Sequence, residues 1–136
     1  MPDVLGEVKS IKSFFIQIRE LLKRDDCWDR IDDLIKNMAN SEKEGHFFTV
    51  VFSRELQVKV FKDPQLHDYL TRKLEPIKND MDPVLLNDTY NLAWFAGDCL
   101  KEMIQTKDNP KETNDFLITG INSANNIIFQ FEKLIE

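Results

Sequence analysis

The chain has 136 residues, of which 42% are hydrophobic and 31% are charged. This length suits one compact domain, and the hydrophobic share is too large for a disordered chain. The formal net charge of −6 weighs against nucleic acid or anionic lipid binding over the whole surface, because both of these partners are negatively charged.

A first helix is predicted over residues 3–24. Its apolar residues recur at alternating steps of four and three, which places them on one face, here called the first seam. The first seam consists of Val4, Val8, Ile11, Phe15, Ile18 and Leu22. A second helix should follow, with Asp25 or Asp26 accepting hydrogen bonds from its first N–H groups, and should end near Asn40.

Residues 46–63, HFFTVVFSRELQVKVFKD, allow two interpretations. Apolar residues at alternate positions predict a β-hairpin over about 47–61. However, the turn at 53–55 has no Gly, Asn or Pro, and a lone two-stranded sheet is only marginally stable. The same stretch also has a helical apolar stripe. Because its neighbours are helical, we favour a buried helix slightly and keep the hairpin as the alternative.

Two Asp-Pro pairs, at 63–64 and 82–83, predict the starts of further helices, since each joins an acidic cap to a proline in the first turn. The first of these helices should stop at Pro76. Residues 77–82 should connect it to a helix that runs to about Gln105.

Residues 106–113, TKDNPKET, are predicted to form a loop before a last helix over about 111–135. The last seam has the same spacing as the first seam and favours shallow-angle packing against another helix. It consists of Leu117, Ile121, Ala124, Ile128, Phe131 and Ile135. We expect the two terminal helices to pack within one bundle. The alternative is a homodimer in which one seam faces a second subunit.

The predicted fold is therefore a single all-α domain over residues 1–136, a compact bundle of five or six helices. The alternative is a mainly α fold that carries one hairpin at about 47–61.

Motifs for catalysis or cofactor binding are nearly all missing from the sequence. The scattered glycines form no phosphate-binding loop, and His46 and His67 are isolated from other metal-ligand residues. Acidic residues on one side of the second helix lack the pattern of a calcium loop, so a solvated face is the simpler interpretation. These residues are Asp25, Asp29, Asp32 and Asp33. We expect no enzyme activity, no catalytic residue, no metal and no cofactor.

Cys27 and Cys99 lie far apart, each inside a predicted helix, as is typical of reduced and partly buried thiols in a cytosolic protein. The first ten residues, MPDVLGEVKS, lack the basic and apolar regions of a signal peptide. Outside the helix that runs to about Gln105, the longest apolar run is 47–52 with Thr49 allowed, which is far shorter than the roughly 20 residues of a membrane helix. We expect a cytoplasmic protein with no membrane contact.

The predicted function is protein–protein interaction, as an adaptor, a regulatory inhibitor or an assembly subunit. Ten phenylalanines and two tryptophans exceed what a small bundle must bury, so some of them should form a partner surface. The candidates are Trp28, Phe47, Phe48 and Phe61. The competing interpretation is that every aromatic residue belongs to the core.

The alternative function is that of a small helical subunit in a nucleic-acid-binding complex. It would use a basic stripe on the first helix, formed by Lys9, Lys12, Arg19 and Lys23. Glu7 and Glu20 interrupt this stripe and no aromatic residues alternate with it, so nucleic acid is the less favoured partner.

Overall fold

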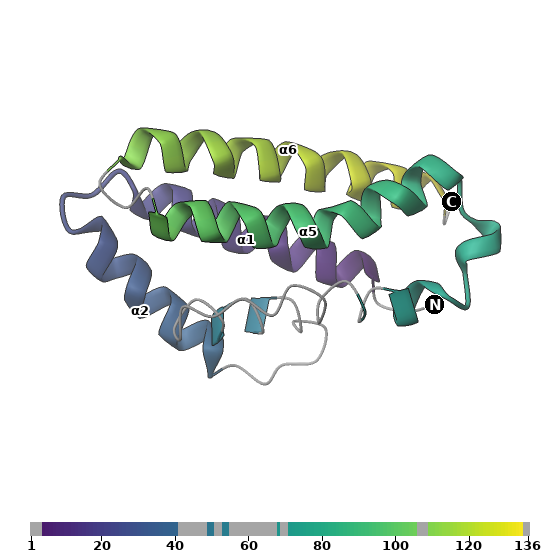
Figure 1. The fold of residues 1–136 in the computed structure, drawn as a ribbon, viewed down its shortest axis with the longest axis horizontal. Helices are drawn as coiled ribbons and strands as arrows, with labels where there is room; N and C mark the ends of the chain where they lie inside the picture. The colour runs from purple at the N-terminus through teal and green to yellow at the C-terminus, as the bar shows by residue number, and fades with distance from the viewer. Residues whose placement is uncertain are drawn as a thin grey trace.

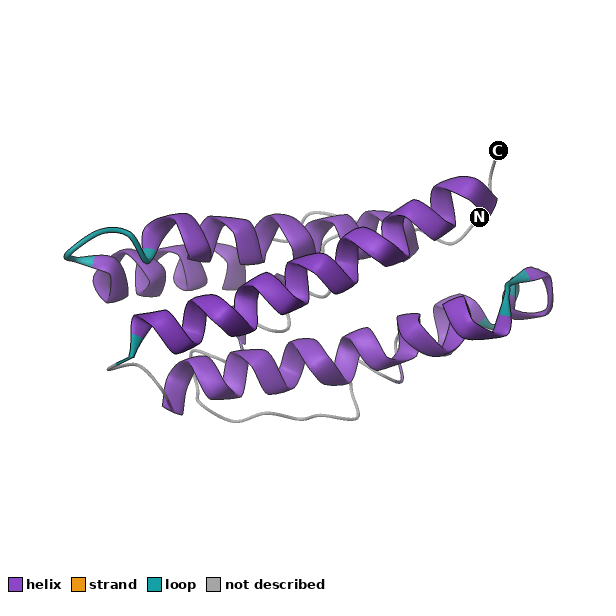
Figure 2. Cartoon of the chain, turned by 90° about the horizontal axis from the view of Figure 1, so that it is seen from above, coloured by secondary structure: helices purple, strands orange, loops and turns teal. Residues whose placement is uncertain are grey.

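The computed structural model describes residues 4–40, 49–50, 53–54, 68, 71–105 and 109–134. Its main elements in this part of the chain are helices α1 (Val4–Leu21), α2 (Cys27–Ala39), α5 (Pro83–Gln105) and α6 (Pro110–Leu134), with a 3₁₀ turn η1 (Lys78–Asp80). None of the described residues lies in a strand (Figure 2). The predicted all-α bundle is therefore confirmed for these residues.

Helix α6 lies beside both α1 and α5 and runs antiparallel to each of them (Figure 1). Two contacts show the direction of the α1–α6 pair. Arg19, near the end of α1, reaches Asn114 near the start of α6, whereas Lys9 pairs with Glu132 near the end of α6. Helix α2 turns back from the end of α1 and packs against it.

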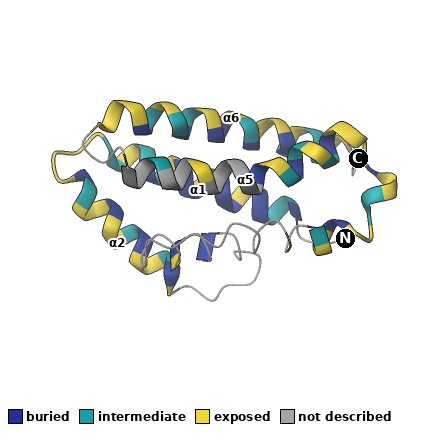
Figure 3. Ribbon diagram, in the orientation of Figure 1, coloured by how far each residue is buried: buried dark blue, intermediate teal, exposed yellow. Residues whose placement is uncertain are grey.

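The two seams form much of the core. Figure 3 shows the buried residues on the inward sides of the long helices. The buried seam residues are Val4, Val8, Ile11, Phe15, Ile18, Leu117, Ile121, Ala124 and Phe131. Leu22 and Ile128 are partly buried against the same core, and Ile135 lies outside the described residues. The prediction that the terminal helices pack within the bundle is confirmed, so the structure uses both seams inside the chain.

Helix α5 begins and ends where the sequence predicted. The carboxylate of Asp82 accepts hydrogen bonds from the backbone N–H groups of Val84 (2.8 Å) and Leu85 (3.3 Å). These bonds satisfy N–H groups that have no partner within the first helical turn, and Pro83 has no N–H to satisfy. The Asp-Pro pair at 82–83 thus fixes the start of α5 as expected.

The boundary between α1 and α2 differs from the prediction. Helix α1 ends at Leu21, and residues 22–26 form turns before α2. Asp26 occupies the N-cap position of α2, but its side chain makes no capping hydrogen bond. Its carboxylate instead accepts hydrogen bonds from Arg24 Nε (3.1 Å) and Arg30 Nε (3.0 Å). Capping by Asp26 was wrong, because the two guanidinium groups engage the oxygens that a cap would use.

The last helix was predicted to begin at about residue 111, and α6 begins at Pro110, so this start is confirmed within one residue. The predicted loop over 106–113 extended too far, because residues 110–113 are helical. Asn109 Oδ1 accepts a hydrogen bond from the Glu112 backbone N–H (3.2 Å), and Asn109 Nδ2 donates one to Glu112 Oε2 (3.4 Å). This reciprocal pair is a capping box with asparagine as the cap. Asn109-Pro110 therefore starts a helix as Asp82-Pro83 does, with a side chain that accepts backbone hydrogen bonds followed by a proline in the first turn.

The stretch at 46–63 is described only at residues 49–50 and 53–54, and all four are helical. The hairpin alternative is wrong at these positions. Thr49, Val50 and Ser53 are buried, and the hydroxyls of Ser10 and Thr49 form a hydrogen bond of 3.1 Å that joins this stretch to α1. Residues 71–74 are helical and residues 75–77 form a turn, so the predicted stop at Pro76 is confirmed. The predicted start at 63–64 lies outside the described residues.

Candidate functional site

The structure describes one of the four predicted partner-binding residues. Trp28, in the first turn of α2, is partly buried and packs against the hydrophobic core. Phe47, Phe48 and Phe61 lie outside the described residues. Trp28 therefore contributes to packing with part of its side chain, and its role in partner binding stays a prediction. Exposed large apolar side chains lie elsewhere on the described helices.

Three large apolar side chains in the described part of the chain are exposed: Ile16 (37%), Val84 (64%) and Phe129 (57%). Ile16 lies on α1 and Phe129 on α6, the two helices that pack along their seams, whereas Val84 lies in the first turn of α5. The sequence-based search missed all three. The available signal was that Ile16 and Phe129 fall outside the two seams.

A groove of about 390 Å³ runs between the outer sides of α1 and α6. We call it the α1–α6 groove. Its lining residues are Lys9, Lys12, Ser13, Ile16, Gln17, Ile128 and Glu132. Ile16 and Ile128 supply its apolar side chains, and Phe129 follows Ile128 directly on α6. Charged and polar side chains make up the rest of the lining, an arrangement typical of a small interface with an apolar centre and a polar rim.

The charges around the α1–α6 groove are only partly paired. Lys9 Nζ lies 3.6 Å from Glu132 Oε1, and both side chains are about half exposed. Lys133 Nζ lies 4.6 Å from the centre of the Phe129 ring, at the distance of a cation–π contact. Lys12 is half-buried and makes no ion pair with the described residues. The groove therefore offers one ammonium group that can accept an acidic partner without breaking an existing ion pair.

The basic stripe of the alternative function is largely occupied within the chain. Arg19 Nε donates a hydrogen bond to Asn114 Oδ1 (3.0 Å), and Lys23 Nζ lies 3.1 Å from Glu20 Oε2. Lys9 is paired with Glu132. Of the four residues of the stripe, only Lys12 therefore makes no ion pair or side-chain hydrogen bond within the described part of the chain. Phosphate groups on this face would therefore compete with side chains that already hold three of the four cations.

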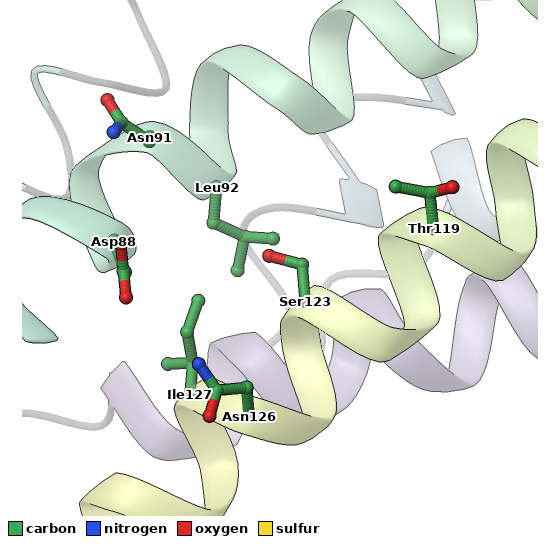
Figure 4. A pocket seen from close by; sticks show the side chains of 7 residues that line it. All are labelled: Asp88, Asn91, Leu92, Thr119, Ser123, Asn126 and Ile127. Atoms are coloured by element: carbon green, nitrogen blue, oxygen red, sulfur yellow. The ribbon is translucent and has the colours of Figure 1, made fainter.

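A second groove, of about 320 Å³, lies between α5 and α6 (Figure 4). We call it the α5–α6 groove. It is lined by Asp88, Asn91, Leu92, Thr119, Ser123, Asn126 and Ile127. Figure 4 shows Leu92 and Ser123 pointing toward one another from the two helices. Leu92 and Ile127 are buried, so they form an apolar floor under side chains that carry a carboxylate, hydroxyls and carboxamides.

The remaining residues considered for metal binding or catalysis are the acidic residues in and just before α2, the cysteines and the histidines. Hydrogen bonds from Arg30 and then Arg24 hold the pKa of Asp26 below its ordinary value. Within the described ranges, no three His, Cys, Asp or Glu side chains come together to form a metal site. Cys27 is buried and has a free thiol. His46 and His67 lie outside the described residues.

Among the helices as far as they are described, none is both long enough and apolar enough to cross a membrane. No protein-family model matches the chain, and no curated protein or solved structure matches it either.

Proposed function

We propose that this chain is a non-enzymatic protein–protein interaction domain that binds another protein through the α1–α6 groove. The observation that carries the proposal is the exposure of two large apolar side chains on adjacent helices: Ile16 lines this groove, and Phe129 directly follows the lining residue Ile128 on α6. Large apolar side chains that stay in water lose the free energy that burial would provide, and a partner that covers them recovers it.

The partner's chemistry follows from the groove. Ile16 and Ile128 would receive an apolar side chain of the partner, and Phe129 would be covered beside them. Lys12 would pair with a partner carboxylate, because it has no ion pair of its own in the described part of the chain. We therefore expect a segment with an apolar anchor flanked by an acidic residue. An aromatic or aliphatic anchor at the centre, with charged residues at the rim, is the usual composition of an interface.

A pull-down of the tagged full chain from its native cell tests this proposal. The test variant is Ile16→Glu/Phe129→Glu, which places two charges on the apolar surface and should abolish capture of the partner. The matched control is Val84→Glu, because Val84 is as exposed as Phe129 but lies in the first turn of α5. Each variant must first show the thermal unfolding transition of the wild type.

A stoichiometric protein that is captured by the wild type and by Val84→Glu, but not by the double variant, would support the proposal. Equal capture by the double variant would contradict it. Recovery of nucleic acid that is lost on Lys12→Glu, in place of a protein partner, would favour the alternative function.

A further inference from the structure

The α5–α6 groove carries three polar side chains that make no hydrogen bond or ion pair within the described part of the chain: Asp88, Ser123 and Asn126. Asp88 and Ser123 are partly buried, and Asn126 is exposed. Thr119, at the edge of the same groove, donates its hydroxyl proton to the backbone oxygen of Asp115 (3.1 Å). Three kinds of oxygen thus remain available as acceptors around one opening: a carboxylate, a hydroxyl and a carboxamide oxygen.

The helical spacing brings these acceptors together. Asp88 and Leu92 are four residues apart on α5, and Ser123 and Ile127 are four residues apart on α6, so each pair lies on one side of its helix. Figure 4 shows Asp88 from α5 and Ser123 and Asn126 from α6 around the floor of Leu92 and Ile127. A ligand in this groove would meet oxygen acceptors on both walls and apolar atoms beneath.

The charge of the groove selects a cation. Asp88 is the one charged side chain among the described residues that line it. The chain as a whole has a net charge of −6, which raises the local concentration of cations further. A divalent metal ion fits poorly, because calcium and magnesium take six or more oxygen ligands and usually several carboxylates.

We propose that the α5–α6 groove binds a primary alkylammonium group. An ammonium group has three N–H donors and no acceptor, which matches the acceptors offered by Asp88, Ser123 and Asn126. Its alkyl chain would lie on Leu92 and Ile127. Such a group occurs on free amines and on lysine side chains. This site lies on a different side of α6 from the α1–α6 groove, so it does not depend on the proposed function.

Titration of the 136-residue chain with n-butylammonium, followed by the backbone amide signals in NMR spectra, tests the proposal. We expect saturable shifts at the residues that line the α5–α6 groove. Tetramethylammonium carries the same charge without N–H donors and should leave these signals unchanged. Equal shifts with both cations would overturn the proposal, because charge alone would then explain the binding.

Substitutions separate the site from the general field of the protein. Asp88→Asn should weaken n-butylammonium binding roughly tenfold, because the carboxamide oxygen can still accept a hydrogen bond but no longer carries the negative charge that strengthens it. Asp98→Asn is the matched control, since Asp98 is exposed on the same helix but does not line the groove, and it should leave the affinity within about twofold. Ser123→Ala should weaken binding to a lesser degree. Similar losses for Asp88→Asn and Asp98→Asn would contradict a built site.

The source of the ammonium group is resolved by two further ligands, 1,5-diaminopentane and N-acetyl-lysine methylamide. If 1,5-diaminopentane binds more tightly than the lysine derivative, the natural ligand of the groove is a free amine. If N-acetyl-lysine methylamide binds more tightly than the diamine, the natural ligand is a lysine side chain of another protein. Absence of saturable shifts with all three N–H-bearing ligands would overturn the proposal.

Discussion

At the scale of single residues, the same side chain has different roles at the starts of two helices. Asp82 and Asp26 both precede a long helix, yet only Asp82 accepts hydrogen bonds from backbone N–H groups. Asp26 has arginines two residues before it and four residues after it, and both reach its carboxylate. A cap is therefore predictable from sequence only where no nearby cation competes for the carboxylate.

The cap at α5 should have a measurable effect on stability. Replacing Asp82 by Ala removes the acceptor for the N–H groups of Val84 and Leu85, and should lower the free energy of unfolding by about 1 kcal/mol. Chemical denaturation provides the measurement. Asp80→Ala is the control, because Asp80 is exposed in η1 and should change stability by less than about 0.5 kcal/mol. Equal effects of the two substitutions would refute capping by Asp82.

The ion pairs of Asp26 should make stability depend on acid pH. Hydrogen bonds from Arg30 and Arg24 lower the pKa of Asp26 in the folded state below its ordinary value of 3.8. The unfolded chain therefore binds more protons in this range, and the stabilisation is present above 3.8 and is lost as the pH falls through the folded pKa. We expect Asp26→Asn to melt slightly below the wild type at neutral pH and low salt, because both side-chain contacts are solvent-exposed.

The difference between Asp26→Asn and the wild type should shrink as the pH falls below 3.8 and when salt is added. Asp29→Asn is a control on the same helix, where no ion pair involves Asp29 among the described residues. A difference in melting temperature that stays constant from neutral to acid pH would rule out the ion pairs as its cause.

At the scale of helices, the seams were predictable and the grooves were not. The alternating steps of four and three in α1 and α6 identify the faces that the structure buries. Apolar residues at this spacing lie on one side of a helix, and that side packs against the core. A groove depends on how two helices are rotated and spaced against each other, and on which side chains fill the space between them. The sequence of either helix alone does not contain this information.

Helix starts were predictable where the capping residue and the proline after it were both recognised in the sequence. The Asp-Pro signal located the start of α5, and the Asn-Pro signal at 109–110 was present but was taken as part of a loop. The Asn109–Glu112 capping box could have corrected this, since its residues are three apart in the sequence. By contrast, the period of two at 47–61 left a hairpin as the alternative to a helix, and the four described residues of this stretch, 49–50 and 53–54, are helical.

Two phenylalanines on α6 test the division between core and surface. Phe131 is 2% exposed and Phe129 is 57% exposed, although they are only two residues apart. Phe131→Ala should lower the free energy of unfolding by about 3–5 kcal/mol, because it leaves a cavity in the core. Phe129→Ala should cost less than about 1 kcal/mol, and denaturant titration measures both. Comparable losses would mean that Phe129 is a core residue and has no part in a partner surface.

At the scale of the whole molecule, α6 has two accessible sides of different chemistry. On one side, the α1–α6 groove combines apolar side chains with two lysines, Lys9 and Lys12. On the other side, the α5–α6 groove is polar and contains a carboxylate. An acidic chain with a local group of lysines can attract an acidic partner segment to that face while the rest of its surface repels it.

The measurement that tests the account most directly is site-specific photo-crosslinking in the native cell. The photoreactive residue benzoylphenylalanine would replace Phe129 in one variant and Val84 in another, because both positions are exposed on different helices. If the α1–α6 groove is the interaction surface, we expect one discrete crosslinked protein from position 129 and none from position 84. The product from position 129 should disappear when Lys12→Glu is added. Equal crosslinking of the same protein from both positions, or a product from position 84 alone, would contradict it.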